Sequence, residues 1–597
     1  MKIQYESLDI ETLWIDNIAK PFSIGISNKE KILYFQTSVE NIDDDKLIIF
    51  MLEKCKSNVT YYVHNLTFEM FVFIKYFNKY KINFEMISSN KTIYSAKIYY
   101  KNKIIKFKCS YRLTLLSLKD FAKFSNIENK HIFPYNILNE NIKEYMKIKK
   151  KDFNNLEEYN SFIKEHGSYV NIYEILKKYC INDVLITKLC INKFWEIILE
   201  SGLKNKNVLT AAKLSIANFF VKKTLIKKKI QIKYDRILRP YYFGGRTEVF
   251  GNPENYEDVI LHYDWSGMYS QCMCEKVMGG EIYHSNIISS IDNPGFYNIK
   301  FKQNINFPIL PIKYNNKLMF VNGVFSGWYW YEEIKLAIEY GVEILEISSV
   351  IFSQYYDFFL KEFVTINNNI RQKSNLHKQI GKNNNNTFYG RLGMSPDKMD
   401  EFILNDKSKI NDYDKVVEIN DTLLAYKKNE KNISNITISS SITSKARIKL
   451  YRGMMEVIKN GGKLLYSDTD SIIASFNKNN VPLDKQLGEV YFDSKKNDTV
   501  IIDAVFASPK TYALKFSDRE VVKIKGLNSK PFFDEFKEKF YKKECIVNIN
   551  IEWNKKDMQI EKKRKKKITN LYNLDKRIWS DDLKNTKPIN FPYNNDI

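Results

Sequence analysis

The chain has 597 residues, more than a single hydrophobic core usually supports, so we expect at least two domains. Lysine and arginine (93) outnumber aspartate and glutamate (70), and the net charge of +23 favours a nucleic acid over a membrane surface as the partner. The sequence has no apolar run of transmembrane length and no secretory apolar region near residue 1, so we expect no membrane partner.

The first 200 residues alternate short apolar segments with amphipathic stretches, which is typical of an α/β domain. Strands are predicted near residues 3–10, 23–26, 31–36, 59–64 and 103–109, and helices near 68–80 and 169–199. The chain then becomes strongly basic between residues 204 and 233. We therefore place a first domain at 1–200, a linker at 201–250 and a second domain at 251–597.

Carboxylates recur in the first domain at spacings that suit metal binding. Asp9 and Glu11 are two residues apart in a predicted strand, so both side chains point to one face. Glu69 starts a predicted helix, and Tyr179 and Asp183 share a helix face farther on. Together these acids would bind two metal ions for phosphodiester hydrolysis, with Tyr179 orienting the attacking water. Each acid alone is more simply a surface charge or a helix cap.

The second domain contains two further acidic motifs. Asp264 ends a strand predicted at 259–263. Asp468 and Asp470 lie between two strand-like runs in Tyr466-Ser-Asp-Thr-Asp-Ser471, which predicts a β-hairpin with both carboxylates on one face. The alternative for this segment alone is an ordinary solvated turn. Paired in space, Asp264 and Asp470 would hold two Mg²⁺ ions for phosphoryl transfer.

Lys382, Asn386 and Tyr389 recur at helical spacing, so they form one stripe on a helix that follows helices predicted at 332–341 and 355–381. A cation, an amide and an aromatic ring on one stripe suit the phosphate, the polar edge and the base of an incoming nucleotide. The alternative is an asparagine-rich helix end capped by Gly390.

Taken in order, these motifs resemble the family B DNA polymerases, specifically the protein-primed branch of phages, linear plasmids and mitochondrial plasmid-like elements. Three motifs resemble the editing exonuclease, one the linker that touches template DNA, three the polymerase site, and one the segment that contacts the primer strand. The eight are Asp9-Ile-Glu11, Asn65 to Glu69, Tyr179 to Asp183, Tyr242-Phe-Gly244-Gly245, Asp264 to Tyr269, Lys382 to Gly390, Tyr466 to Ser471 and Lys510-Thr-Tyr512. They span residues 9 to 512, most of the chain.

The resemblance implies a multidomain fold of α/β and α+β type. A ribonuclease-H-like 3′→5′ exonuclease domain would be followed by a right-hand polymerase domain with palm, fingers and thumb. The fingers would cover about 355–392 and the thumb about 515–597. Two insertions in the palm, at about 281–360 and 394–440, would enclose the DNA and receive a priming protein.

In the implied polymerase site, Asp264, Asp470 and the backbone carbonyl of Trp265 would bind metal, with Asp468 adjacent and supporting. Tyr269 would lie under the sugar and exclude a 2′-hydroxyl. The incoming nucleotide would be bound by Lys382, Asn386 and Tyr389, with Lys378 and Arg371 as helpers.

In the implied editing site, metals would be bound by Asp9, Glu11, Glu69 and Asp183. The frayed 3′ end would be held by Asn65, Phe68 and Ser110. Outside the two sites, the template strand would be contacted by Tyr242, Gly244 and Gly245, and the primer strand by Lys510 and Tyr512. Each active site would use two Mg²⁺ ions, with Mn²⁺ as a substitute.

The sequence departs from the family pattern at several motif positions. Gly267 lacks the hydroxyl of the usual serine, and Ser270 replaces a proline that stiffens the turn. Thr387 replaces a serine but keeps its hydroxyl. Glu69 stands where an aspartate is usual. Its extra methylene can shift the position of a metal ligand, and the coordination geometry of Mg²⁺ is strict.

The resemblance therefore implies a DNA-directed DNA polymerase that extends a primer by two-metal nucleotidyl transfer and proofreads with a 3′→5′ exonuclease. DNA template and primer and the four dNTPs would be its ligands. Because the first exonuclease motif begins at residue 9, we expect the priming (terminal) protein to be a separate partner or cleaved from a precursor. An A+T-rich codon bias and the resemblance favour a mitochondrial location, with a cytoplasmic linear plasmid or a virus as the alternative.

Three other functions are weighed against this one. A reverse transcriptase usually has adjacent carboxylates, whereas Thr469 separates Asp468 from Asp470. An exonuclease with a degenerate polymerase half finds its best support in Gly267. A non-catalytic DNA-binding replication factor needs only the charge of +23.

Overall fold

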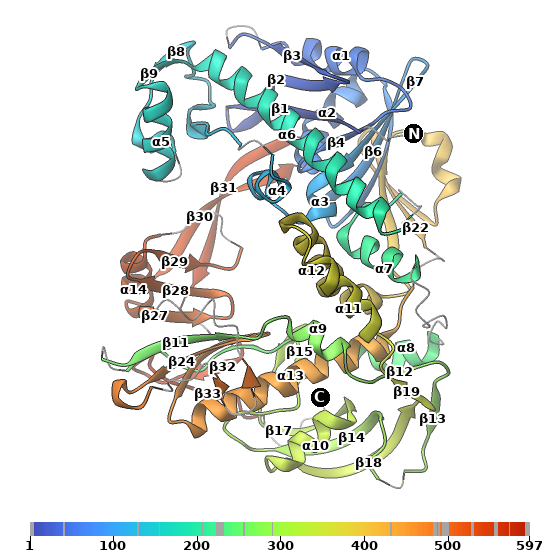
Figure 1. The fold of residues 1–597 in the computed structure, drawn as a ribbon, viewed down its shortest axis with the longest axis vertical. Coiled ribbons are helices and arrows are strands. Elements are labelled where there is room, and N and C mark those ends of the chain that lie inside the picture. Colours follow the sequence, from blue (N-terminus) through green and yellow to red (C-terminus); the bar gives the residue numbers. More distant parts are fainter. Residues whose placement is uncertain are drawn as a thin grey trace.

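The computed structural model describes most of the chain. The residues that it describes are 5–39, 42–127, 130–153, 156–203, 207–221, 232–254, 257–288, 290–429, 433–481, 486–487, 490–491, 501–526, 531–554, 559–571 and 574–591. Among the helices in these ranges, none combines the length and the apolar character that a membrane span needs. The first domain lies at the top of Figure 1 and the predicted palm at the bottom, with the predicted fingers between them.

The first domain is built on a mixed sheet whose central strand is β1 (Glu6–Ile15). β1 pairs antiparallel with β2 (Ile18–Asn28) and parallel with β4 (Thr60–Val63). The remaining strands of this domain's part of the sheet are β3 (Lys31–Gln36), β5 (Asn83–Ser89), β6 (Thr92–Tyr100) and β7 (Lys103–Cys109). Parallel pairing at its centre requires helical crossovers, which the chain supplies.

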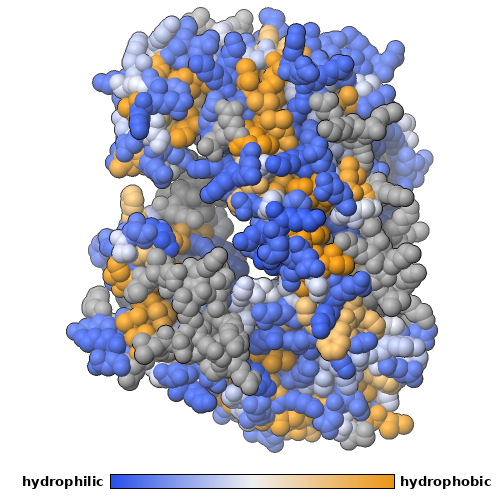
Figure 2. All heavy atoms as spheres, viewed as in Figure 1, coloured by the Kyte–Doolittle hydropathy of each residue, from blue (hydrophilic) through white to orange (hydrophobic). Residues whose placement is uncertain are grey.

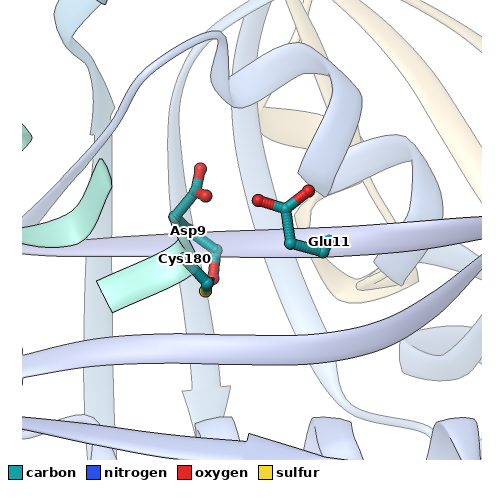
Figure 3. Close-up of side chains that lie close together, drawn as sticks. All are labelled: Asp9, Glu11 and Cys180. Carbon is teal, nitrogen blue, oxygen red and sulfur yellow. The ribbon is translucent and has the colours of Figure 1, made fainter. Parts of the chain in front are cut away.

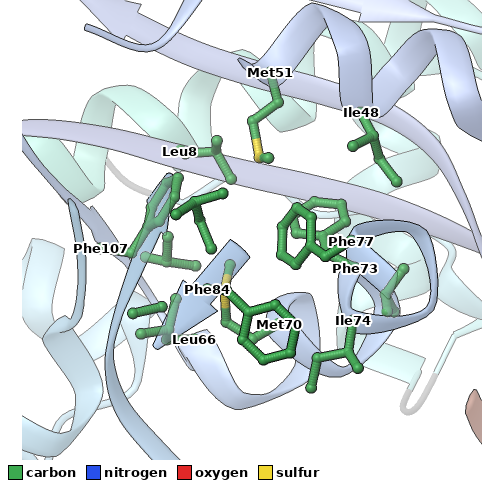
Figure 4. Close-up of a cluster of buried hydrophobic side chains, with 14 of the residues drawn as sticks. Leu8, Ile48, Met51, Leu66, Met70, Phe73, Ile74, Phe77, Phe84 and Phe107 are labelled. Atoms are coloured by element: carbon green, nitrogen blue, oxygen red, sulfur yellow. The ribbon is translucent and has the colours of Figure 1, made fainter. Parts of the chain in front are cut away.

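Helices cover this sheet closely. α1 (Asp44–Lys54) and α2 (Leu66–Lys79) pack apolar side chains against Leu8 and Ile10 of β1 (Figure 4). Because side chains alternate along a strand, Asp9 and Glu11 point to the other face, where α6 (Ile172–Glu200) packs. Gly25 of β2 permits this approach, since a Cβ there would lie 2.8 Å from Val184 of α6. The other helices of this part are α3 (Ser110–Thr114), α4 (Leu118–Ser125), α5 (Leu156–His166) and α7 (Ala211–Val221).

Segments from the second half of the chain extend this sheet at both ends. β20 (Met399–Leu404) pairs antiparallel with β5, and β21 (Lys415–Ile419) and β22 (Thr422–Lys428) follow it. At the other end β31 (Gln559–Asn570) pairs with β2, and β30 (Cys545–Asn554) completes a 12-stranded sheet. The second predicted insertion and the predicted thumb therefore both add strands to the first domain.

The predicted palm is a seven-stranded sheet, ordered β10-β23-β24-β11-β27-β28-β29. Its strands are β10 (Thr247–Val249), β11 (Val259–Asp264), β23 (Lys463–Asp468), β24 (Ser471–Phe476), β27 (Ile501–Ser508), β28 (Thr511–Phe516) and β29 (Glu520–Lys523). α13 (Ile436–Lys459) packs behind it, and Gly453 leaves room for the indole of Trp265, because a Cβ would lie 2.4 Å from that ring.

The first predicted insertion forms a four-stranded sheet of its own, in the order β13-β18-β14-β17. Its elements are β13 (Tyr283–Ser285), β14 (Gly295–Gln303), β17 (Gly323–Trp330), α10 (Tyr331–Glu339) and β18 (Glu343–Phe352). Short ribbons accompany it, formed by β12 (Val277–Gly279) with β19 (Tyr355–Asp357) and by β15 (Ile312–Tyr314) with β16 (Lys317–Met319).

The predicted helix at 355–381 is wrong in its bounds, because a break at residues 371–374 divides it. α11 (Lys361–Ile370) ends there, and α12 (Asn375–Leu392) carries the stripe of Lys382 and Tyr389. Three buried asparagines join the two helices, with a bond from Asn367 Nδ2 to Asn385 Oδ1 at 3.0 Å and one from Asn384 Nδ2 to Asn367 Oδ1 at 3.1 Å. The asparagine run therefore locks the helix pair, which explains its composition.

The C-terminal part returns to the palm. After α14 (Phe533–Tyr541) and the β30–β31 ribbon, β32 (Arg577–Trp579) and β33 (Thr586–Pro588) form a small hairpin. The Thr586 backbone N–H donates to Phe250 O and the Asn252 N–H to Lys584 O, each at 2.9 Å. In the same orientation, Figure 2 shows the molecule hollowed between its upper and lower halves, with hydrophilic residues over α12.

The seam between β5 and β20 yields a testable prediction about stability. Asn405 closes it with three hydrogen bonds, because its Oδ1 accepts from Phe84 N at 3.0 Å and its Nδ2 donates to Ile82 O at 2.9 Å and Asn78 Oδ1 at 3.3 Å. Asn405→Ala should lower the unfolding free energy by about 1–3 kcal/mol, measured by urea denaturation. The reason is that the Phe84 N–H and the Ile82 carbonyl of the backbone lose the hydrogen-bond partner that Asn405 provides. Asn141→Ala, at an exposed position, is the matched control, and an equal effect of both would contradict the seam's importance.

Candidate active sites

The first acidic cluster gathers side chains from one strand and two helices. Asp9 and Glu11 come from β1, Glu69 from the first turn of α2, and Asp183 from α6. The ligand atoms of Asp9, Glu11 and Cys180 lie within 4.8 Å of one another (Figure 3). In that view the two carboxylates point to the same side of β1, whereas the Cys180 sulfur lies against the backbone of Asp9.

Burial makes ionisation of the carboxyl groups in this cluster strongly unfavourable. Glu11, Glu69 and Asp183 are all buried, and Glu69 Oε2 and Asp183 Oδ1 have no hydrogen-bond partner among the residues that the structure describes. Desolvation and the neighbouring carboxylate of Asp183 raise the pKa of Asp9 to about 8. Desolvation and Asp9 likewise hold the pKa values of Glu11 and Glu69 well above the usual range. Oxygen ligands with unused lone pairs at this density fit a hard divalent cation.

Two residues that the sequence analysis missed complete this cluster. Lys130 bonds through Nζ to Asp183 Oδ2, and the hydroxyl of Tyr135 contacts that of Tyr179. Lys130 Nζ also lies 4.7 Å from the centre of the Tyr179 ring. Both residues come from the irregular chain between α4 and β8, where no spacing marks them. Only the tertiary structure brings them to α6.

The residues predicted to hold a frayed 3′ end differ in accessibility. Asn65 is exposed in a left-handed conformation (φ 75°) before α2, and Phe68 is half-buried in its first turn. Ser110 is fully buried, and its hydroxyl donates to Val63 O at 3.3 Å and lies 3.0 Å from His64 Nδ1. The predicted DNA contact of Ser110 is therefore wrong for this conformation, because the hydroxyl faces the protein interior.

The second acidic cluster lies where three palm strands end. β11 and β24 pair so that Asp264 is opposite Ser471, and the Trp265 N–H donates to Asp470 O at 2.8 Å. This pairing brings the ends of the two segments together, as predicted. The predicted β-hairpin is confirmed, but its strands include only one of the two acids. β23 ends at Asp468 and Thr469 is left-handed (φ 65°), so strand alternation does not set the direction of Asp470.

Asp468 is held by its neighbours. Its Oδ1 accepts from the Thr247 hydroxyl at 3.0 Å and the Thr469 hydroxyl at 3.1 Å, and lies 3.3 Å from Lys510 Nζ. The Tyr466 hydroxyl donates to Oδ2 at 3.4 Å. The partly exposed Lys510 occupies the turn between β27 and β28, beside the half-buried Tyr512. This arrangement fits the supporting role expected of Asp468 and brings the Lys510 motif to the acidic hairpin.

The Tyr242-Phe-Gly-Gly linker reaches the same hairpin. A Cβ on Gly245 would lie 2.8 Å from Thr469 Cγ2, whereas a Cβ on Gly244 would meet nothing within 4 Å. Arg447 of α13, another residue missed from sequence, donates to the carbonyls of Phe243 at 2.8 Å and Gly244 at 3.1 Å. Glu333 pairs with Arg447 through two bonds of 2.7 Å, all in the interior. Gly245 is thus needed for packing, and Gly244 leaves the surface open.

The predicted nucleotide-binding stripe is present on α12. Lys378, Lys382 and Asn386 are all exposed along it, and Tyr389 follows half-buried. Tyr389 stacks on Tyr269 of α9 (Met268–Met273), with ring centres 4.2 Å apart and planes at 19°. This stack joins the segment from Asp264 to Tyr269, here called motif A, to the stripe, an arrangement that sequence spacing alone does not show.

Arg371 is not on that stripe. It ends α11, where its side chain covers Gly381, because a Cβ on that glycine would lie 2.7 Å from Arg371 Cγ. Its guanidinium donates to Asn368 Oδ1 at 3.2 Å. In this conformation Arg371 packs α11 against α12, and its contact with a nucleotide stays a prediction.

Gly267 has a structural explanation. It precedes α9 in the left-handed region (φ 67°), where residues with a side chain are strained. A Cβ would otherwise fit, with its nearest atoms in Ser270 at 3.7 Å. The loss of a hydroxyl at this position is therefore a consequence of the turn that starts α9.

Comparisons with known proteins agree on one family. The family model described as DNA polymerase type B, organellar and viral, matches residues 52–460. Probable DNA polymerases of Neurospora intermedia and Podospora anserina are 26% and 25% identical, over 72% and 83% of this chain and 49% and 47% of their own lengths. The DNA-directed DNA polymerase of Enterobacteria phage PRD1 is 28% identical over 48% of this chain and 51% of its own length. The chain spans about half the length of these curated relatives.

The fold is similar to that of a solved polymerase. The structure of Phi29 DNA polymerase complexed with primer-template DNA and incoming nucleotide has a TM-score of 0.67, at 17% identity over 95% of this chain and all of that one. Its binary complex with primer-template DNA scores 0.65 over 92% of this chain. The predicted fold class, a multidomain exonuclease and right-hand polymerase architecture, is confirmed.

The first cluster predicts that divalent cations stabilise the protein. Mg²⁺ or Mn²⁺ should raise the melting temperature relative to protein in EDTA, because binding to the native state alone adds stability. Glu69→Gln should reduce this rise, since it removes one buried ligand charge. Glu346→Gln changes an exposed glutamate and serves as the control. An equal metal-dependent rise in wild type and Glu69→Gln would show that Glu69 contributes nothing to binding.

Without divalent cations, stability should fall as the pH rises. The pKa of Asp9 is about 8 in the native protein against 3.8 ordinarily, so the native state keeps a proton that the unfolded chain loses. The unfolding free energy therefore declines as the pH rises from about 4 to about 8. Asp9→Asn should flatten this dependence in thermal unfolding with EDTA, and parallel curves for the two proteins would refute it.

Proposed function

The chain belongs to the type B DNA polymerases of organelles and viruses, and we propose that it extends a primer strand on a DNA template. One observation carries the proposal. The paired ends of β11 and β24 bring Asp264 and Asp470 together, while the Tyr269–Tyr389 stack joins motif A to the exposed stripe of α12. Carboxylates suited to metals thus lie near the aromatic pair at one end of a helix stripe that also carries a cation and an amide suited to a nucleotide.

Each residue has a task in the proposed synthesis. Lys382 and Lys378 would bind the triphosphate, and Asn386 and Tyr389 would line the nucleotide pocket. Tyr269, held by its stack on Tyr389, would lie under the sugar. Asp264, Asp470 and the Trp265 carbonyl would hold two Mg²⁺ ions, which supply charge neutralisation and activate the 3′-hydroxyl. Asp468 and Lys510 keep the hairpin in place beside the primer strand.

We further propose that the first cluster is a 3′→5′ proofreading exonuclease. The buried set of Asp9, Glu11, Glu69 and Asp183 fits two divalent cations, because two of its oxygens lack any partner. Tyr179 would orient the attacking water, with its hydroxyl held by Tyr135. Lys130 balances part of the negative charge through Asp183. The carboxylate of Asp9 adds to the raised pKa of the buried Glu69, which supports including Glu69 in this cluster despite its extra methylene.

The partners are proposals as well. DNA template and primer and dNTPs are the expected ligands, and Phi29 DNA polymerase has been solved in complex with primer-template DNA and incoming nucleotide substrates. A terminal protein whose hydroxyl primes synthesis, and a mitochondrial location with a cytoplasmic plasmid or virus as the alternative, stay predictions.

The alternative function, an exonuclease with a degenerate polymerase half, is less well supported than active synthesis. Gly267 adopts a left-handed backbone conformation that favours glycine, so it has a structural reason. The paired ends of β11 and β24 hold the acids of the polymerase half, and the stripe of α12 is exposed. Active synthesis is therefore the better-supported function.

Primer extension with Mg²⁺ and four dNTPs tests the assignment. Wild type should extend the primer, and Asp470→Asn should slow extension by at least about 1000-fold, because it removes several kcal/mol of charge stabilisation. Asp9→Ala should still extend but should no longer degrade a mismatched 3′ end. Full extension by Asp470→Asn would refute the polymerase site. Degradation by Asp9→Ala at the wild-type rate would refute the editing site.

Sugar selection tests the role of Tyr269. Tyr269→Val should raise ribonucleotide incorporation relative to deoxyribonucleotide by at least about 10-fold, because a smaller side chain admits the 2′-hydroxyl. Tyr269→Phe keeps the ring and its stack on Tyr389, so it should remain selective. The measurement is kcat/KM for each nucleotide, and unchanged selectivity in Tyr269→Val would exclude the role.

A further inference from the structure

An exposed aromatic ribbon lies beside the entrance to α6. β8 (Tyr145–Lys147) and β9 (Tyr169–Asn171) pair antiparallel, so that Lys147 is opposite Tyr169 and Tyr145 opposite Asn171. Alternation along the strands puts these four side chains on one face. The central residues of the two strands, Met146 and Val170, pack into the core on the other face. The ribbon therefore has one anchored face and one face in solvent.

The solvent face exposes two tyrosine rings. Tyr145 is 55% exposed and Tyr169 67% exposed, which is unusual for side chains of this size. Their ring centres are 6.3 Å apart and their planes differ by 22°. Near-parallel aromatic rings that project into water from a fixed ribbon are a surface on which nucleobases stack.

The charge around the rings suits the same ligand. Residues 143–151 contain five lysines, all exposed, against one glutamate. The exposed charged residues are Lys143, Lys147, Lys149, Lys150, Lys151 and Glu144. The Glu144 carboxylate already accepts from Asn171 Nδ2 at 2.9 Å. The glutamates of α5 follow this lysine-rich segment in the chain and belong to a separate helix. The lysines thus offer phosphate contacts beside two base-stacking rings.

The ribbon is also rigidly connected to the first acidic cluster. The Ile172 N–H, at the start of α6, donates to Glu144 O at 2.7 Å, and Asn171 caps that helix through Glu174 N at 3.1 Å. Asp183 follows 11 residues after Ile172 in the same helix, about 16 Å along its axis. α6 thus joins the ribbon to the first acidic cluster through one continuous helix.

We propose that Tyr145, Tyr169 and Lys147 form a binding surface for single-stranded DNA, outside both acidic clusters. The bases stack on the tyrosines and the phosphates pair with the lysines, so binding does not depend on base sequence. The inference rests on the proposed function only in naming DNA as the ligand. Its tests measure binding, so they need neither synthesis nor degradation.

Photocrosslinking locates the surface directly. Single-stranded DNA carrying 5-iodouracil is irradiated with the full chain in EDTA, with the palm occupied by unlabelled primer–template duplex, and crosslinked peptides are identified by mass spectrometry. Crosslinks at Tyr145 or Tyr169 are expected. Crosslinks confined to other peptides would overturn the proposal, whether or not primer extension succeeds.

Affinity measurements then separate binding from folding. Tyr145→Ala and Tyr169→Ala should each weaken binding of a fluorescent oligothymidylate by at least about five-fold, because each removes a stacking ring. Tyr145→Phe and Tyr169→Phe keep the rings and should bind as wild type. Lys147→Ala should reduce the salt dependence of binding by about one phosphate contact.

The matched control is Tyr80→Ala, which removes another tyrosine with 44% exposure at the end of α2. Its DNA affinity should not change. Equal weakening in Tyr80→Ala, or a lowered melting temperature in the ribbon variants without weaker binding, would overturn the proposal and leave the rings a structural role.

Discussion

Mutual repulsion among carboxylates is the constraint on which both acidic clusters depend. Four acids of the first cluster share a buried space, and burial raises the pKa of each of them. Neighbouring carboxylates raise the pKa values of Asp9, Glu11 and Glu69 further. Such a group separates unless the backbone that carries it is held by something stronger. The apolar contacts of α1 and α2 on one face of β1, and the close approach of α6 at Gly25 on the other, provide that force.

In the palm, the carboxylates are held close together by hydrogen bonds and strand pairing, not by burial in an apolar interior. Its acids are half-exposed, and hydrogen bonds around Asp468 and the strand pairing that brings Asp264 to Asp470 fix the hairpin. Trp265 fills the space at Gly453, which joins the strand end to α13. Arg447 of the same helix, neutralised by Glu333, binds the carbonyls of the glycine linker. One helix thus supports both the acids and the linker beside them.

The large sheet connects the two halves. Strands from the second insertion and from the predicted thumb lengthen the sheet of the first domain, so a boundary drawn along the sequence does not separate independent sheets. Asn383 of α12 also donates to Thr114 O of α3 at 2.7 Å. This bond and the shared sheet therefore join α12 and its neighbours to the first domain.

By itself, the sequence determined the family, the order of the motifs and most acids of both clusters, because local spacing decides which side chains share a strand or helix face. It also predicted the stripe of α12, where helical periodicity is sufficient. Only the tertiary structure decided that Lys130, Tyr135 and Arg447 complete the sites, that Ser110 faces inward, that Arg371 packs over Gly381, and that Thr469 turns the acidic hairpin. These features depend on contacts between segments far apart in the chain, and local spacing carries no information about which distant segment packs against a given residue.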